Sequence, residues 1–348
     1  MKKQRKSAQF KDGFSEGLKP LRPLALSEVR TVNDLVTQMS HTAFGGRSVG
    51  EAADVLHKMV SDKDCFVVLT LSGALTVAKM GLVICDLIDS GMVQAVVSTG
   101  AIMAHGFVES AGMSHFKYEP HLKDEKLYKS GYNRVYDTLE LEKNLDNVEL
   151  IVRKVLDKIS RKTTLSSELI NKRLGEYLLE NAKGRGILKS AFTKKVPVYV
   201  PAFTDSELGL DLGIYNRKAK LKKKPLFRFD PLLDLESFTD LIKDRKRIGI
   251  FTIGGGVPRN WAQQAAPYLD IIQKRIKSGG GFKRYSYGVR ICPEPTHWGG
   301  LSGCTYSEGV SWGKFLPPRE GGRWAEVYAD ATIALPMIVK AVLERIGK

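Results

Sequence analysis

Short apolar runs that end in small or hydroxyl residues recur along the chain, and they restrict its fold more than any other feature. They are rich in β-branched residues and too short for isolated helices, which is typical of buried strands. Amphipathic stretches at 49–62, 147–160 and 167–182 alternate with them. Repetition of strand and helix predicts an α/β fold with a mainly parallel sheet covered on both faces. The runs are CFVVLTLSGAL (65–75), VQAVVSTGAI (93–102), VPVYVPAFTD (196–205), RIGIFTIGGG (247–256) and the weaker YGVRICP (287–293).

The length and composition are compatible with one large domain. The chain has 348 residues, of which 43% are hydrophobic, enough for a sizeable core. We divide it into a basic N-terminal arm (1–25) and a single domain (26–348). No apolar run approaches the roughly 18 residues of a membrane span, and none follows the basic N-terminus. We therefore expect a cytoplasmic protein with no membrane contact.

Cysteine and histidine positions do not predict a metal centre. The four cysteines are scattered without CxxC pairs, and the six histidines form no HExxH motif or other ligand spacing. We expect reduced thiols, no disulfide framework and no metal.

A formal net charge of +16 could attract nucleic acid or an acidic protein. A solvated surface is the favoured interpretation, because no aromatic residue interrupts the basic run RKAKLKKK to stack on bases. That run belongs to a segment, 206–245, that we expect to be a loop over the site or a surface insertion. The basic clusters are Lys2–Lys6, Arg153–Arg173, Arg217–Lys224 and Lys243–Arg247.

Three strand ends carry small residues that suit a nucleotide. They read LSGAL (71–75), STGA (98–101) and IGGGVPRN (253–260). Glycines let a ligand approach the backbone, whose N–H groups bind phosphates. A tight turn explains each one equally well alone, but three at equivalent strand ends favour a nucleotide pocket.

The segment TYSEGVSWGKF (305–315) combines an acid, an indole and a lysine between glycines. A nucleophilic lysine needs a lowered pKa and close access for its substrate. The face of Trp312 would attract an alkylammonium ion, and Glu308 would neutralise an amine. A lysine in a glycine-rich turn is more often a surface residue, so the rest of the sequence must decide whether Lys314 is catalytic.

EGVSWGK (308–314) and EVYADATIALPMIVKAV (326–342) together resemble the C-terminal catalytic segment of the deoxyhypusine synthase family. GGG (254–256), PAFTDSELG (201–209) and STGA (98–101) follow in the family's order. The resemblance implies a sirtuin-like NAD-binding fold for residues 26–348. It also implies a homotetramer with active sites between paired subunits.

The resemblance implies aminobutyl transfer, a reaction of the alkyl-transferase class. NAD takes a hydride from the carbon beside the secondary amine of spermidine, giving an imine. The lysine matched by Lys314 attacks this imine, displaces 1,3-diaminopropane and holds the aminobutyl group as a Schiff base. The group then passes to an acceptor amine, and the retained NADH reduces the product.

Further roles transfer from the family position by position. Trp312 would stack along the polyamine, Glu308 would hold one of its amines, and Asp205 would contact cofactor or substrate, with Glu207 and Asp211 as acidic neighbours. The expected cofactor-binding residues are Ser72, Gly73, Ser98, Thr99, Gly100, Gly254, Gly255, Gly256, Asp330 and Ala331.

The chain departs from the family on the acceptor side, where we expect Asn260 and His105 to bind substrate. Asn260 replaces a family histidine, and His105 lies near the position of an expected glutamate. PTHWGGLSG (295–303) replaces an acidic stretch. The change to asparagine is familiar from plant homospermidine synthases, and the pattern is similar to bacterial deoxyhypusine synthase-like proteins.

We therefore predict homospermidine synthesis from spermidine and putrescine, a small diamine acceptor. Transfer to a protein lysine of a translation factor is the main alternative. A protein that binds NAD or polyamine without turnover, and a nucleic-acid binder supported by charge alone, are the others.

Overall fold

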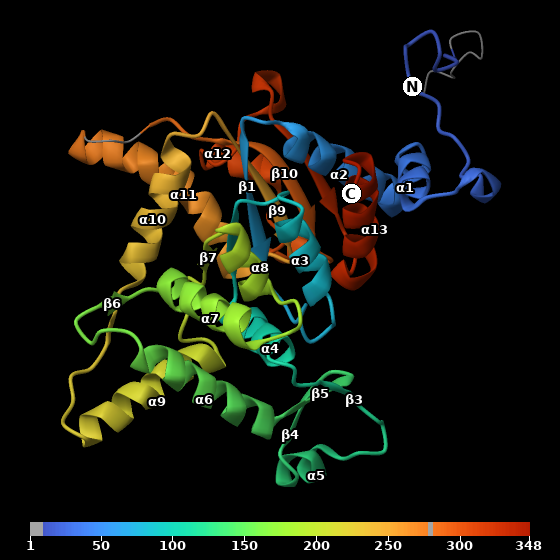
Figure 1. Ribbon diagram of the computed structural model, residues 1–348. Coiled ribbons are helices and arrows are strands. Elements are labelled where there is room, and N and C mark those ends of the chain that lie inside the picture. Colours follow the sequence, from blue (N-terminus) through green and yellow to red (C-terminus); the bar gives the residue numbers. More distant parts are fainter. Residues whose placement is uncertain (1–9, 278–280) are drawn as a thin grey trace, which may run out of the picture.

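The computed structural model describes residues 10–277 and 281–348, and a six-stranded sheet lies at its centre (Figure 1). The strand order is β11-β10-β9-β1-β2-β7, and every neighbouring pair is parallel. The predicted α/β fold with a mainly parallel sheet is therefore confirmed. The strands are β1 (Cys65–Leu71), β2 (Ala95–Ser98), β7 (Val198–Tyr199), β9 (Arg247–Ile253), β10 (Tyr285–Ile291) and β11 (Arg323–Val327).

The central strands β1 and β9 are buried on both faces because alternate side chains enter two different cores. Along β1, Val67, Leu69 and Leu71 join the larger core, whereas Phe66 and Val68 join the smaller one. This two-sided burial explains why both strands are continuous apolar runs in the sequence rather than alternating patterns.

Helices cover each face. The larger core is closed by α1 (Val32–Ser40), α2 (Phe44–Ser61), α3 (Gly81–Asp89), α4 (Gly100–Ser110), α7 (Ser167–Asn181), α8 (Ile187–Lys194) and α13 (Ala331–Arg345). The smaller core is closed by α10 (Pro231–Lys243), α11 (Gly256–Ile276) and α12 (Tyr306–Ser311). Among the described residues, none of the helices combines the length and apolar character that a membrane crossing requires.

A smaller layer projects beyond the sheet, at the bottom of Figure 1. An antiparallel sheet of order β3-β5-β4 lies beside α5, and β6 pairs with β8. These elements are β3 (Phe116–Lys117), α5 (Asp124–Lys129), β4 (Tyr132–Val135), β5 (Thr138–Leu141), α6 (Glu142–Asp157), β6 (Thr164–Leu165), α9 (Glu207–Leu221) and β8 (Arg228–Phe229).

The expectation of a loop or surface insertion at 206–245 is wrong, because most of this segment forms α9 and α10. Ser206 caps α9 by accepting a hydrogen bond from the Gly209 N–H, and Asp230 caps α10 ahead of Pro231. Leu208, Leu212, Tyr215 and Ala219 of α9 are buried at helical spacing. The Arg217–Lys224 cluster lies at the exposed end of α9, where Lys218 pairs with Glu149 of α6 at 2.7 Å.

The N-terminal arm leads away from the rest of the chain (Figure 1). Residues 10–25 are mostly exposed, including Phe10, Phe14 and Leu18. The basic cluster Lys2–Lys6 lies outside the described residues.

Candidate active site

The predicted nucleophile, Lys314, projects from a backbone held against the edge of strand β10. Its N–H donates to the Gly309 carbonyl at 3.0 Å, and its carbonyl accepts from the Tyr285 N–H at 2.8 Å. Its side chain is 8% exposed, and Nζ donates to Asn260 Oδ1 at 2.9 Å. Nζ also lies 5.9 Å from the centroid of the Trp312 ring. The buried amine of Lys314 is therefore oriented by Asn260, a residue 54 positions earlier in the chain.

The surroundings of Lys314 favour its neutral form. Burial is the largest effect and lowers the pKa of the lysine, and the positive charge of Arg259 lowers it further. Cys304 and Glu308 act in the opposite direction without reversing the shift. A neutral amine has the free electron pair that attack on an imine requires, so the environment suits a Schiff-base lysine.

Lys314 opens into a cavity of about 290 Å³. Glu308 and Trp312 line it, as the sequence predicts, and Gln264, Thr296 and Cys304 line it as well. Gln264 and Cys304 carry no motif that sequence reasoning could have used, whereas Thr296 belongs to PTHWGGLSG, the stretch that the sequence marks as a departure. The cavity combines a carboxylate, an indole face and an amine, and these groups are complementary to a cationic alkylamine.

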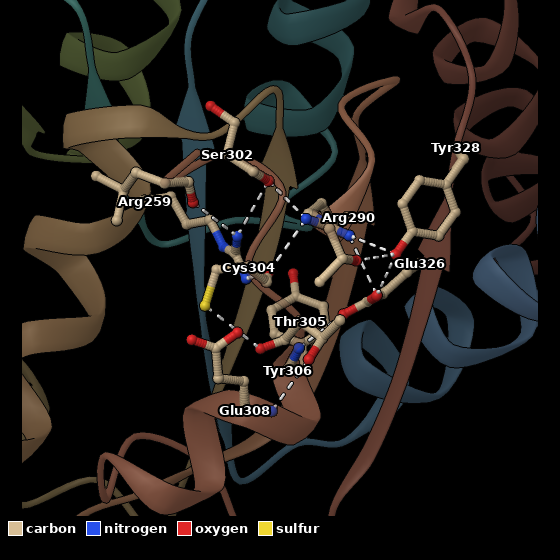
Figure 2. A network of polar contacts seen from close by, with 11 residues as sticks. Arg259, Arg290, Ser302, Cys304, Thr305, Tyr306, Glu308, Glu326 and Tyr328 are labelled. Carbon is tan, nitrogen blue, oxygen red and sulfur yellow. Dashed lines mark hydrogen bonds and ion pairs between the residues drawn. The ribbon is translucent and has the colours of Figure 1, made fainter. Parts of the chain in front are cut away.

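Two buried arginines fix the loop that forms one wall of this cavity (Figure 2). Arg290 on β10 is fully buried and donates to the carbonyls of Ser302 and Cys304 at 2.5 and 3.1 Å, while its second nitrogen meets Glu326 Oε2 at 3.1 Å. Arg259 on α11 donates to the Cys304 carbonyl at 2.6 Å. Sequence analysis missed both, although an arginine inside the apolar run YGVRICP is the signal that could have revealed Arg290.

A second, larger cavity of about 750 Å³ lies at the carboxyl ends of β1, β9 and β10. Five predicted cofactor residues line it: Ser72, Gly73, Gly254, Asp330 and Ala331. Strand order reverses direction around β1 and β9, and such a crevice is where open parallel sheets bind ligands.

The glycines of this cavity meet the needs of a bound dinucleotide. Gly73 and Gly254 have φ of +83° and +80°. A Cβ on Gly254 would lie 2.2 Å from Ser72 Oγ, whereas the space beyond Gly73 is open. The volume falls in the roughly 300–1,000 Å³ range of small-molecule sites. The residues present therefore fit a dinucleotide that approaches the backbone closely.

Other predicted cofactor residues have packing contacts instead of lining this cavity. Gly100 begins α4, where a Cβ would lie 2.3 Å from Ser206 Oγ, and it follows the strand end formed by Ser98 and Thr99. Gly255 packs on Ser302 and donates to Ser72 Oγ at 2.7 Å. The third glycine of the run, Gly256, begins α11.

The predicted substrate residues Asp205 and His105 do not line the Lys314 cavity. Asp205 lies in the exposed turn before α9. His105 on α4 places Nδ1 3.3 Å from Glu140 Oε2, and His115 places Nε2 2.6 Å from the same oxygen. His105, His115 and Glu140 are ligand types that metals use, and their sequence spacing gave no sign of this cluster.

Other protein groups surround this cluster. Lys79 Nζ lies 3.0 Å from His115 Nδ1. An ammonium only donates, so Nδ1 accepts this hydrogen bond. Burial alone would raise the pKa of Glu140, but His105, His115 and Asn144 outweigh it and hold that pKa well below its usual range. The pKa of His105 is raised: burial opposes this, but Glu140 and Glu207 prevail.

Comparison with known proteins identifies the family and supports the fold. A model of the family described as deoxyhypusine synthase matches residues 34–342. "Probable deoxyhypusine synthase 2" of Methanosarcina acetivorans is 34% identical over 91% of this chain and 88% of its own length. "Deoxyhypusine synthase-like protein" of Elusimicrobium minutum is 31% identical over 87% of this chain and 78% of its own.

A solved structure agrees on the fold. A crystal structure described as a deoxyhypusine synthase from Entamoeba histolytica superposes with a TM-score of 0.59 over 92% of this chain and 96% of that chain, at 13% identity. The family match covers nearly the whole sheet and the Lys314 segment together. The chain therefore belongs to the deoxyhypusine synthase family, whose members are transferases of aminobutyl groups.

Proposed function

We propose that this protein is an NAD-dependent transferase that takes an aminobutyl group from spermidine onto Lys314 and delivers it to putrescine, making homospermidine. The observation that carries the proposal is the buried Lys314 amine, held 2.9 Å from Asn260 Oδ1 beside a cavity with a carboxylate and an indole. A lysine so placed is pre-oriented for covalent catalysis.

In the transfer, Lys314 Nζ forms a bond to the imine carbon derived from spermidine. The bond from that carbon to the departing nitrogen breaks. The departing nitrogen takes the proton that Nζ loses, and 1,3-diaminopropane leaves. The Glu308 carboxylate pairs with the distal ammonium, and the face of Trp312 covers the alkyl chain. Asn260 keeps Nζ pointed into the cavity.

NAD, held by the glycine-lined cavity, would supply the hydride acceptor for the donor amine and return the hydride to the product. Ser72, Gly73, Gly254, Asp330 and Ala331 are the residues that would hold it. The remaining cofactor candidates (Ser98, Thr99, Gly100, Gly255, Gly256) would shape the strand ends behind it.

The acceptor side supports a small diamine. Asn260 cannot titrate near neutral pH, so unlike a histidine it cannot take a proton from the acceptor. The acceptor amine must therefore bind in its neutral form. The volume of about 290 Å³ suits two short alkylamines. Transfer to a protein lysine is a second candidate, favoured by Trp312, which is 64% exposed at the mouth of the cavity.

We also propose that the protein is a homotetramer, and that the N-terminal arm (1–25) of each chain contacts another subunit. Phe10, Phe14 and Leu18 are at least 65% exposed, and burial against a neighbour would remove this apolar surface from water. His105 and Asp205 would complete a site shared between subunits. Light scattering of the purified chain checks the assembly.

The function is tested by incubating pure protein with NAD, spermidine and putrescine and by trapping the enzyme with borohydride. Homospermidine in the supernatant and an aminobutyl adduct on Lys314 are expected. Lys314→Arg should abolish both, because a guanidinium forms no imine, while Lys340→Arg, at an exposed position of α13, serves as the matched control. Absence of any trapped adduct would refute the proposal. An adduct without transfer to putrescine, but with transfer to a translation factor, would select the second candidate.

A further inference from the structure

The tip of the β4–β5 hairpin forms the outer wall of the 750 Å³ cavity, at a place that no family motif marked. Val135, Tyr136, Asp137 and Thr138 line the cavity opposite the segment that follows β1. Val135 pairs with Thr138, so Tyr136 and Asp137 form a two-residue turn. Tyr136 has a φ of +55°, a left-handed conformation that usually selects glycine or asparagine. Both turn residues line the cavity, so a ligand bound there can reach them.

The buried charge cluster ties this hairpin to the opposite wall. Glu140 on β5 is 1% exposed and meets His115, whose Nδ1 accepts from Lys79 Nζ at 3.0 Å. Lys79 itself lines the cavity on its other side. Asn144 donates to the second oxygen of Glu140 at 2.9 Å. These contacts fix Glu140 of strand β5, three residues beyond Asp137, to the part of the chain that carries Lys79.

Two of the described lining residues carry carboxylates, and these differ in the hydrogen bonds that they already accept. Asp330 Oδ1 caps α13, accepting from the Thr332 N–H at 2.7 Å and the Thr332 hydroxyl at 2.5 Å. Asp137 is exposed, and its Oδ1 accepts from the Thr138 hydroxyl at 3.2 Å. Asp137 thus retains the greater capacity to accept hydrogen bonds from a ligand.

We propose that Asp137 binds the ribose hydroxyls of the dinucleotide and makes the site select NAD over NADP; this rests on the proposed function. A carboxylate that accepts from a ribose 2′-hydroxyl repels the 2′-phosphate of NADP. Lys79 lines the same cavity and supplies a positive charge for the pyrophosphate. A carboxylate repels a phosphate, so Asp137 is suited to the ribose hydroxyls and not to the pyrophosphate.

The test is calorimetric binding of NAD and of NADP to the full chain. Wild type should bind NAD at least tenfold more tightly than NADP. Asp137→Asn should weaken NAD by roughly 10- to 100-fold, the loss expected for charge-assisted hydrogen bonds, while NADP binding is unchanged or tighter. Glu125→Gln, an exposed carboxylate on neighbouring α5, should bind both dinucleotides as wild type does.

Asp330→Asn separates the two acids, since asparagine also caps helices and the fold is kept. It should retain the preference for NAD. If Asp330→Asn erases the preference, or if Asp137→Asn keeps the wild-type ratio, the assignment of Asp137 is refuted. Failure of the wild-type chain to bind either dinucleotide would instead refute the proposed NAD-dependent function.

Discussion

Asn260→Asp tests whether the neutral amine of Lys314 drives the chemistry. The substitution keeps the shape of the side chain and places a carboxylate oxygen about 2.9 Å from Nζ. With an effective dielectric of about 20, a charge pair at this distance gains about 6 kcal/mol. Discounting about half of this for desolvation of the new carboxylate leaves about 3 kcal/mol, or roughly 2 pKa units.

The sign follows from which form is reactive. A carboxylate beside Nζ stabilises the ammonium, raises the pKa of Lys314 and reverses the lowering caused by burial and Arg259. Adduct formation at neutral pH should then fall about 100-fold, with the rate rising tenfold per pH unit until the shifted pKa is reached. Rapid borohydride quenching between pH 6 and 10, followed by intact-mass measurement, gives this profile.

The matched control adds the same charge elsewhere in the same cavity. Gln264 also lines the cavity, and its change to glutamate should produce a smaller displacement of the profile than Asn260→Asp. Adduct formation by Asn260→Asp within about threefold of wild type at pH 7, with an unshifted profile, would show that protonation of Lys314 does not limit the reaction.

Two further substitutions probe the cavity of 750 Å³ and the charge cluster beside it. Gly254→Ala should lower the free energy of unfolding by about 2–4 kcal/mol in urea denaturation and weaken the binding of NAD, because its Cβ would lie 2.2 Å from Ser72 Oγ at a φ of +80°. The control Gly299→Ala, at φ +71° with open space around it, should cost only about 1 kcal/mol. Equal losses in the two variants would contradict the steric reasoning. The depressed pKa of Glu140 contributes stability that is complete above its unfolded pKa near 4.5 and is lost as pH falls toward the folded value. Glu140→Gln should therefore lower the Tm at pH 7. Its Tm should also fall less on acidification than the Tm of Glu125→Gln. An unchanged slope of Tm against pH would mean that ionised Glu140 does not stabilise the fold.

The sequence predicted the sheet well where strands are buried on both sides, because such strands are continuous apolar runs. Strand β11 was missed because Arg323 and Glu326 interrupt its short apolar pattern. The helices α9 and α10 were missed because a run of charges concealed the buried spacing of Leu208, Leu212 and Tyr215.

The catalytic segment could be predicted for local reasons, whereas its surroundings could not. Glu308, Trp312 and Lys314 lie within one short stretch, and the structure keeps them at one cavity. Glu140 meets His105 from 35 residues away, a distance with no period that a sequence pattern can reveal. Only the path of the chain through β3, α5 and β4 brings these two residues together.

The pairing of β1 with β9 has a consequence for how the protein is made. Thr70 on β1 bonds to Thr252 on β9, 182 residues later in the chain, at the centre of the sheet. During synthesis the apolar edge of β1 must wait for more than half of the polypeptide to emerge before its partner exists, which makes folding slow and leaves an aggregation-prone edge uncovered. A nascent chain without its last hundred residues lacks Asn260, Glu308, Trp312 and Lys314, so it cannot form the cavity that holds the lysine.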